Sequence, residues 1–365
     1  MKKRIACFHL LNDYSGSPIV LKMVLQGLLE RGWSVDLISS RGGVLDDLER
    51  MEGCKKKSYT YQFSKSAIVT LLRYTFAQLY TMFLAFGYIG KKGMVFYINT
   101  ILPVGPALAG WIMRKHVVYH YHENARAKST MYKVLAWIME HIADEIICVS
   151  DYQASQLNRK DHVTVVPNAL SREFKEKTTH DIDKAFAEQR VLMLSSLKVY
   201  KGTREFISLA HRMPHIQFSL VLNASEEGIK WYMESEHLTL PSNLRLYPRH
   251  EDVRQFYDHS SMLVNLTKKK MVIETFGLTA LEAMTAGLPV IVPTVGGIAE
   301  MVEDGVNGYK IDVEDIDKIE QTIERILGDK ALYTQLAQAA LDYSNQFDEK
   351  KMVEAIEEKL TRKYE

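Results

Sequence analysis

The sequence contains few cysteines and almost no net charge. Only three of its 365 residues are cysteine, and Cys7, Cys54 and Cys148 lie too far apart to show metal-site spacing. Cys7 and Cys148 fall in apolar runs, so we expect buried thiols in a reducing compartment. The net charge of +1 argues against a dedicated nucleic-acid-binding protein, because such proteins usually carry a strongly basic domain.

Signals for secretion and for dinucleotide binding are also missing. The basic start of the chain leads directly into the apolar run 5–10, which is too short for the core of a signal peptide. We therefore expect a cytoplasmic protein. No G-x-G-x-x-G sequence follows a predicted strand, which argues against a nicotinamide-dependent oxidoreductase.

The sequence does contain a regular alternation of short apolar runs with amphipathic segments. In the first half, runs at 5–11, 35–39, 94–99, 117–121, 144–150 and 163–166 predict strands, and segments 18–29, 103–113 and 131–143 predict helices. Ser17 as N-cap and Pro18 as first helical residue mark the start of the first helix. The pattern predicts an α/β protein with parallel sheets, long enough for two domains. We place these domains at 1–170 and 190–345, joined by a polar linker at 171–189.

A stretch from Glu274 to Val292 predicts an anion-binding site. Gly277 precedes a helix predicted to run from Leu278 to Ala286. Unpaired N–H groups at such a helix start suit a phosphate, and two nearby carboxylates, Glu274 and Glu282, suit hydroxyl groups. A nucleotide sugar carries both. The alternative is that a glutamate near a helix start is favourable there without any ligand.

The same stretch resembles the signature of the retaining glycosyltransferases of family 4. The resemblance lies in the two glutamates with seven residues between them, the Phe276-Gly277 pair, and the trailing Glu-Ala-Met-x-Ala-Gly-x-Pro. It implies two Rossmann-like α/β domains facing each other across a cleft, the architecture called GT-B. The last helix, 346–365, would then pack back on the first, acceptor-side domain, and the second domain would bind the nucleotide sugar. The implied activity is transfer of a sugar from a nucleotide-diphosphate donor to an acceptor hydroxyl, with retention and without a metal.

The resemblance also implies roles for individual residues. Three would be catalytic: His122 at a strand end facing the donor sugar, Lys201 at the pyrophosphate, and Glu274 at the sugar hydroxyls. Glu282 would accept hydrogen bonds from the ribose. The full donor-binding set is Gly16, Ser17, Lys198, Lys201, Arg249, Glu274, Phe276, Gly277, Leu278, Thr279 and Glu282.

The sequence departs from the family pattern at several of its positions. Ser17 replaces the second glycine of a Gly-Gly pair, Ala169 replaces a glycine, and Leu266-Thr267 replaces Pro-Ser. Ser196 stands where the family usually has arginine, so Lys198 is the candidate for a second positive charge. A uridine donor is favoured over guanosine.

Residues 55–92 combine an apolar, aromatic segment with flanking lysines. Arg73 and Gln78 interrupt the run at 66–90, which argues against a transmembrane helix. The segment predicts one or two helices packed in the core, or alternatively a surface at the membrane interface. A peripheral membrane contact would suit a glycan or lipid-linked glycan acceptor in cell-surface polysaccharide biosynthesis, at the inner face of the membrane. The lysines 268–270 predict a solvated loop or, alternatively, a phosphate or membrane contact.

Two other functions stay open at this point. One is a sugar-nucleotide epimerase or a phosphorylase of the same architecture, although no motif indicates the Schiff-base lysine that a glycogen-type phosphorylase needs for its cofactor. The other is a non-catalytic nucleotide-sugar-binding protein, which the departure at Ser196 allows.

Overall fold

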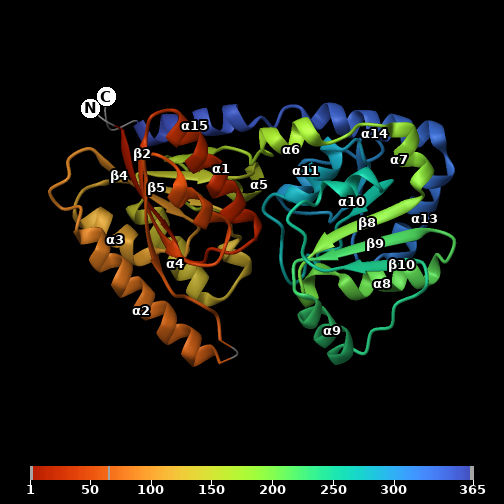
Figure 1. The fold of residues 1–365 in the computed structure, drawn as a ribbon, viewed down its shortest axis with the longest axis horizontal. Helices are drawn as coiled ribbons and strands as arrows, with labels where there is room; N and C mark the ends of the chain where they lie inside the picture. The colour runs from red at the N-terminus through yellow and green to blue at the C-terminus, as the bar shows by residue number, and fades with distance from the viewer. Residues whose placement is uncertain (1–2, 65, 362–365) are drawn as a thin grey trace. The chain divides into compact units, whose positions relative to one another are not determined.

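The computed structural model describes residues 3–64 and 66–361. These residues form two compact units. The first contains the chain up to Ala169 together with the segment from Glu349 onward, and the second contains Leu170–Asp348 (Figure 1).

The first unit is built on a parallel seven-stranded sheet with the order β3-β2-β1-β4-β5-β6-β7. Its central strands are continuous apolar runs, because a parallel sheet is covered on both faces. The strands are β1 (Arg4–His9), β2 (Ser34–Ser40), β3 (Cys54–Tyr59), β4 (Met94–Asn99), β5 (His116–Tyr121), β6 (Glu145–Cys148) and β7 (Val163–Val165).

Helices cover the two faces of this sheet. They are α1 (Gly16–Glu30), α2 (Ala67–Phe86), α3 (Val104–Ile112), α4 (Thr130–Ile142), α5 (Asp151–Ser155) and α15 (Glu349–Thr361), with the short turns η1 (Val44–Arg50) and η2 (Ala125–Ala127). Parts of α2, α3 and α4 share one apolar cluster with Val117 and Tyr119 of β5. The alternate residue His116 hydrogen-bonds through Nε2 to the Lys359 carbonyl of α15, at 2.9 Å. Because side chains alternate along a strand, α15, and α1 beside it, cover the opposite face (Figure 1).

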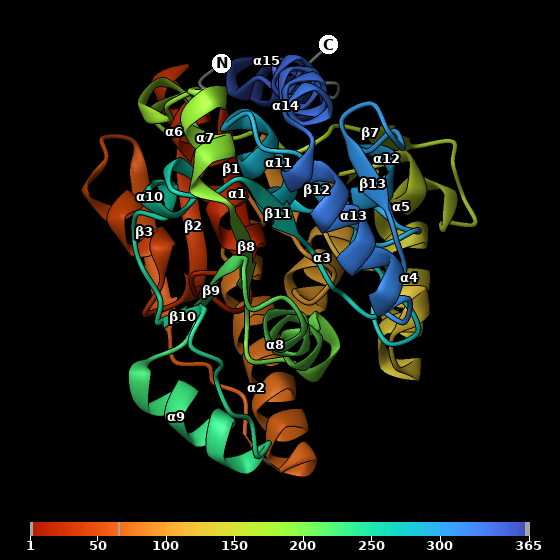
Figure 2. The same cartoon turned by 90° about the vertical axis from the view of Figure 1, so that its right-hand side faces the viewer.

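The second unit repeats this plan with six parallel strands in the order β10-β9-β8-β11-β12-β13. The strands are β8 (Arg190–Ser195), β9 (Gln217–Leu222), β10 (Leu244–Tyr247), β11 (Met262–Val264), β12 (Val290–Val292) and β13 (Gly308–Lys310). The helices are α6 (Arg172–Lys177), α7 (Ile182–Glu188), α8 (Thr203–Arg212), α9 (Glu226–Ser235), α10 (Arg254–Asp258), α11 (Leu278–Thr285), α12 (Gly297–Glu300), α13 (Ile316–Gly328) and α14 (Lys330–Ser344), with η3 (Val199–Lys201). Figure 2 shows α11 beside α14 and the strands β11 and β12, which it contacts.

In each sheet the strand order reverses once. The reversal lies between β1 and β4 in the first unit and between β8 and β11 in the second. Ligands of open α/β sheets bind outside the carboxyl ends of the strands at such a reversal. These two strand ends are therefore where the functional residues of each unit are sought.

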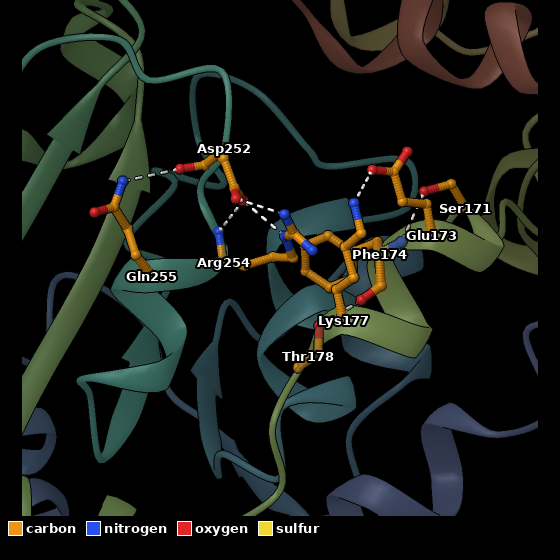
Figure 3. A network of polar contacts seen from close by, with 8 residues as sticks. All are labelled: Ser171, Glu173, Phe174, Lys177, Thr178, Asp252, Arg254 and Gln255. Atoms are coloured by element: carbon orange, nitrogen blue, oxygen red, sulfur yellow. Dashed lines mark hydrogen bonds and ion pairs between the residues drawn. The ribbon is translucent and has the colours of Figure 1, made fainter.

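Residues 171–189 differ from the expected linker, because they form α6 and α7 within the second unit. Ser171 caps α6 by accepting a hydrogen bond from the Phe174 N–H at 3.2 Å. The Phe174 ring lies 6.2 Å from that of Tyr257 of α10, centroid to centroid. Figure 3 shows this neighbourhood, in which Arg254 forms a two-pronged ion pair with Asp252. The polar segment is thus an ordered part of the second unit.

The apolar segment at 66–90 forms one long helix, α2. The predicted packing in the core holds for only a small part of this helix. Ala77, Gln78, Thr81 and Ala85 are buried, whereas the large apolar side chains are mostly exposed. By length and composition alone α2 is able to cross a membrane. Only 17% of its most apolar window is buried within the protein, so α2 is not a typical core helix.

The lysines 268–270 are held in ion pairs. Their ammonium groups lie 2.7 Å from Glu205, 2.5 Å from Asp312 and 2.7 Å from Glu314, in chain order. Since Lys268 and Lys269 are only 25% and 33% exposed, the segment is a pinned loop on the second unit.

Candidate active site

The strand reversal of the second unit brings together Lys201 and Glu274, which form an ion pair. Lys201 ends η3 after β8, and the next residue, Gly202, has a φ of 79°. A Cβ at Gly202 would lie 2.3 Å from the Leu266 carbonyl oxygen, so only glycine lets this turn approach the segment after β11. The close approach places the Lys201 ammonium against the carboxylate.

The Glu274 carboxylate is further fixed by hydroxyl and amide groups. The Thr267 hydroxyl donates to Glu274 Oε1 at 2.9 Å. Burial by itself would raise the pKa of Glu274, but the Lys201 charge and the hydrogen bonds of Thr267 and Asn265 lower it below its ordinary value. Burial likewise opposes the charge on Lys201, and Glu274 raises the pKa of Lys201 above its usual range. The pair is therefore fully ionised at neutral pH.

Helix α11 begins beside this pair, as the sequence predicts. Gly277 is its N-cap with a φ of 102°, and no side chain caps the helix. A Cβ there would lie 2.5 Å from the Ile298 side chain. The first N–H groups of a helix have no partner within the helix, so those of Leu278 and Thr279 can serve an anion. The α11 start thus offers a phosphate site next to a lysine.

Glu282 lies on the second turn of α11 and accepts a hydrogen bond from the Tyr257 hydroxyl at 2.5 Å. Burial raises the pKa of this carboxyl to about 7, although the Tyr257 hydrogen bond acts in the opposite direction. The two glutamates of the motif therefore differ, since Glu274 is held charged and Glu282 titrates near neutrality.

The raised pKa of Glu282 predicts a pH dependence of stability. Its folded-state pKa of about 7 exceeds the ordinary 4.5, so the folded protein holds this proton more tightly than the unfolded chain. The resulting stabilisation is complete below about pH 4.5 and is lost as the pH rises through about 7. We expect the free energy of unfolding of the wild type to fall relative to that of Glu282→Gln between about pH 5 and about pH 8.

Urea unfolding of both proteins across this range measures the effect. The buried histidines, whose pKa values are lowered by burial, change stability in the opposite direction but are common to both proteins. A constant difference between wild type and Glu282→Gln over the whole range would contradict the assignment.

The strand reversal of the first unit carries a chain of hydrogen bonds that ends at His122. Asn99, at the end of β4, donates through Nδ2 to His9 Nδ1 at 3.0 Å and accepts through Oδ1 from His122 Nε2 at 3.1 Å. His9 Nε2 in turn lies 2.7 Å from the Leu11 carbonyl oxygen. With these donors and acceptors, the row of hydrogen bonds from Leu11 to His122 is satisfied by one set of tautomers, in which both imidazoles are neutral. Asn99 therefore fixes the orientation of the His122 ring.

His120 and His122 point the same way, as the alternation of β5 predicts. Their ring centroids are 4.2 Å apart. His120 is fully buried, and its Nδ1 lies 2.7 Å from the Tyr97 hydroxyl. Burial lowers the pKa of His120 to about 3. Burial, together with His120 and His9, also lowers the pKa of His122 well below its ordinary value. His122 is partly exposed and is the one of the two able to meet a ligand.

Three predicted residues, Ser17, Phe276 and Leu278, either lie differently from the expectation or contribute only backbone. Helix α1 starts at Gly16 with Ser15 as N-cap, so Ser17 lies inside the first turn and the predicted capping role is wrong. The Phe276 ring is buried against Phe347, with centroids 5.8 Å apart, which leaves its backbone for a ligand. Leu278 likewise contributes only its backbone N–H to the candidate site.

Two predicted cations are exposed on loops of the second unit. Lys198 precedes η3, and Arg249 follows β10, where its N–H donates to the Ala224 carbonyl at 3.0 Å. Both follow the carboxyl ends of strands of the same sheet, which is the edge where ligands of open α/β sheets bind.

Sequence reasoning missed His9, Asn99, Tyr257 and Thr267. Each supports a predicted residue, and His9, Asn99 and Thr267 stand at or just after the carboxyl end of a strand. A polar residue at the end of an apolar strand was the available signal. Only the strand order shows which of these ends are neighbours.

The described ranges, 3–64 and 66–361, contain no group of three or more His, Cys, Asp or Glu residues placed to hold a metal ion. Two Asp-Ile-Asp triplets, at 181–183 and 315–317, resemble metal motifs in sequence. In the structure Asp181 and Asp315 cap α7 and α13 by accepting from N–H groups at 2.9 and 3.3 Å. These triplets are helix starts.

Comparisons with known proteins agree with this geometry. The family profile described as "Glycosyltransferase Family 4" matches residues 14–174, and that described as "Glycosyl transferases group 1" matches residues 174–342. An uncharacterized glycosyltransferase of Methanocaldococcus jannaschii is 28% identical over 59% of this chain and 58% of its own length. A probable sucrose-phosphate synthase of Oryza sativa is 28% identical over 49% of this chain and 18% of its own length. This chain thus spans less than two thirds of these relatives.

Among solved structures, HepE of Anabaena in complex with UDP and glucose is similar in fold. Its TM-score is 0.81 at 20% sequence identity, with 99% of this chain and 100% of that chain covered. The two family profiles together span residues 14–342, and both units have the Rossmann-like sheet order. The chain therefore belongs to the glycosyltransferases of family 4 type, with the GT-B fold.

Proposed function

We propose that this protein is a retaining glycosyltransferase that moves a sugar from a uridine-diphosphate donor to an acceptor hydroxyl. The observation that carries the proposal is the Lys201–Glu274 ion pair at the strand reversal of the second unit, beside the uncapped start of α11. A cation and free N–H groups suit a diphosphate, and fixed carboxylates suit sugar hydroxyls. The UDP and glucose bound to the Anabaena neighbour support the choice of donor.

The proposed step exchanges one C–O bond for another at the anomeric carbon. The acceptor oxygen attacks the anomeric carbon while the bond between this carbon and the diphosphate oxygen breaks. The acceptor proton passes to the departing phosphate on the same face. Negative charge grows on the leaving diphosphate, where Lys201 and the N–H groups of Leu278 and Thr279 stabilise it. Donors fixed in place before the reaction supply stabilisation without reorganisation. No metal ion is required in this scheme.

The two carboxylates hold the donor at its two ends. Glu274 accepts hydrogen bonds from hydroxyls of the transferred sugar, and Glu282 accepts them from the ribose. The resemblance to family 4 assigns His122, which is neutral and held by Asn99, to the transferred sugar. Lys201 and Glu274 neutralise each other in the structure, so neither of these two buried charges is left unpaired.

The proposed acceptor is a glycan, attached to a lipid at the inner face of the membrane, in the assembly of a cell-surface polysaccharide. The exposed apolar residues of α2, in the first unit, support a lipid-linked rather than a free acceptor. A lipid-linked acceptor requires an enzyme that works at the surface of the bilayer.

A thermal-shift panel of nucleotide diphosphates and nucleotide sugars, with and without magnesium, tests the donor site. Ligand binding raises stability by about 2.7 kcal/mol when the ligand is present at 100 times its Kd. We expect UDP and a UDP-sugar to raise Tm equally with and without magnesium. Stabilisation by NAD(H) alone would favour an oxidoreductase, and stabilisation only with magnesium would contradict the metal-free site.

Turnover assays separate the transferase from its alternatives. Release of UDP that depends on an added acceptor identifies a transferase, whereas conversion of a UDP-sugar without acceptor identifies an epimerase. Tight binding with no turnover on any acceptor would indicate a non-catalytic binding protein.

A further inference from the structure

Helix α2 differs from an ordinary surface helix, because its large apolar side chains face away from the protein. Five of them recur at intervals of three or four residues, which places them on one face of the helix. These residues and their exposed fractions are Ile68 (72%), Leu72 (65%), Phe76 (74%), Leu79 (63%) and Phe83 (75%). We call this set the α2 stripe. Soluble proteins seldom expose a contiguous apolar surface of this kind without a partner for it.

Polar contacts on the inner face of α2 fix this orientation. Gln78 Oε1 accepts from the Gly105 N–H at 2.9 Å, and the Tyr74 hydroxyl donates to the Leu102 carbonyl at 2.8 Å. A Cβ at Gly105 would lie 2.3 Å from the Gln78 carbonyl oxygen, so α2 and α3 touch through their backbones. Turning the stripe inward would break these contacts. Inserting α2 across a bilayer would instead expose the same polar groups to hydrocarbon.

The segment around α2 is strongly basic in a nearly neutral chain. Residues 55–143 contain twelve lysines and arginines and two glutamates, a net charge of +10 against +1 for the whole sequence. Glu140 is buried, as is the side chain of Lys56, which pairs with Asp46, so the exposed charge of the segment is mainly positive.

Lysines of this segment lie at the side and at the end of α2. Exposed Lys55 and Lys57 share a face of β3 with Tyr59, whose ring centroid is 6.1 Å from that of Tyr80 of α2. Beyond the C-terminal end of α2, Lys115 Nζ donates to the Lys91 carbonyl at 2.6 Å. The apolar stripe is therefore accompanied by basic groups of the same unit.

We propose that α2 lies in the interface of an anionic lipid bilayer, with the α2 stripe among the acyl chains and the surrounding lysines at the headgroups. An apolar helix face with basic neighbours is what interfacial helices present, and anionic headgroups supply the complementary charge. A second copy of this chain fits less well, because a two-fold contact would bring two copies of the same basic segment together. The inference rests on the proposed function for its lipid-linked acceptor. Binding of the protein to vesicles, however, is measured without any sugar transfer.

Sedimentation of the full chain with vesicles tests the proposal. One set of vesicles contains phosphatidylglycerol and phosphatidylcholine, and the other contains phosphatidylcholine alone. We expect binding to the anionic set that weakens with added salt, and a loss of about tenfold or more in Phe76→Ser/Phe83→Ser. The matched control is Trp231→Ser, which removes a 65% exposed aromatic side chain from α9 and should bind as the wild type does.

Each other outcome overturns the proposal. Absence of binding to anionic vesicles, or equal binding by the Phe76→Ser/Phe83→Ser variant, would remove the bilayer as occupant. A dimer in solution that this variant abolishes would assign the stripe to a second copy. UDP stabilisation is measured on every variant, so a failed donor site and a failed membrane surface are told apart.

Discussion

Replacing Glu274 by alanine is expected to lower the turnover of glycosyl transfer on the order of 10³-fold while the protein stays folded. The carboxylate is fixed by Lys201 and Thr267, and in the proposed mechanism it orients the transferred sugar. Its loss also frees Lys201, which then holds the diphosphate more tightly, so affinity for UDP should be kept or increased. The measurement is initial rate with a UDP-sugar and acceptor, alongside calorimetric titration with UDP.

Two variants give this experiment its controls. Glu274→Gln keeps the size of the side chain and a hydrogen-bond acceptor for Thr267, so it should fold like the wild type and still lose the charge. Glu314→Ala removes an exposed partner of Lys270 in the same unit and should leave turnover unchanged. Turnover like that of the wild type in Glu274→Ala would refute the role given to this residue.

Replacing Gly202 by alanine is expected to cost about 3 kcal/mol of folding free energy and to abolish UDP binding. The backbone at this position has a φ of 79°, and the new Cβ would lie 2.3 Å from the Leu266 carbonyl oxygen. Relief requires the turn after β8 to move away from the segment after β11, which separates Lys201 from Glu274. Urea unfolding measures the stability, and a UDP thermal shift measures the site.

Gly228→Ala is the matched control for this substitution. Gly228 lies in α9, where a Cβ would meet no atom closer than 3.5 Å and the backbone is ordinary helix. Alanine there should stabilise the protein by about 0.5 to 1 kcal/mol. If Gly202→Ala proved as harmless as Gly228→Ala, the close approach would not be what positions Lys201.

The sequence was sufficient for most strands of the first unit and for the motif at 274–292, because both depend on local patterns. It was not sufficient for β3, since three of the six residues of that strand are lysine. The predicted helix 278–286 is confirmed as Leu278–Thr285, ending before Gly287, whose φ is 72°. A local signal was misread at the first helix, where two serines precede Pro18. Ser15 has the extended N-cap conformation, and its hydroxyl donates to Asp13 at 2.5 Å rather than capping the helix.

The linker prediction gave too much weight to polarity. Residues 171–189 also contain Ser171 and Asp181, and both cap helices in the structure. Caps are visible in a sequence, but two short polar helices look like a loop when judged by composition.

Contacts between distant residues could not be predicted. Asn99 and His9 meet because β4 lies next to β1, 90 positions apart in the chain, and this pairing follows only from the strand order. The orientation of α2 is a similar case. Its composition predicts burial, whereas its actual orientation follows from Gly105 and Gln78, which bind α3 to its polar side.

The return of α15 to the first unit affects the order in which a ribosome-bound chain can fold. Glu357 of α15, whose pKa is lowered to about 2, accepts hydrogen bonds from Lys3 and Trp33, each at 2.8 Å. Gly27 of α1 leaves room for Val353, since a Cβ there would lie 2.8 Å from that side chain. Residues 349–361 emerge from the ribosome only after the whole of 170–348, so the second unit can complete its core while the first still lacks a helix. During synthesis the first-made half of the protein is therefore the last to be finished, and its uncovered face needs protection until translation passes α15.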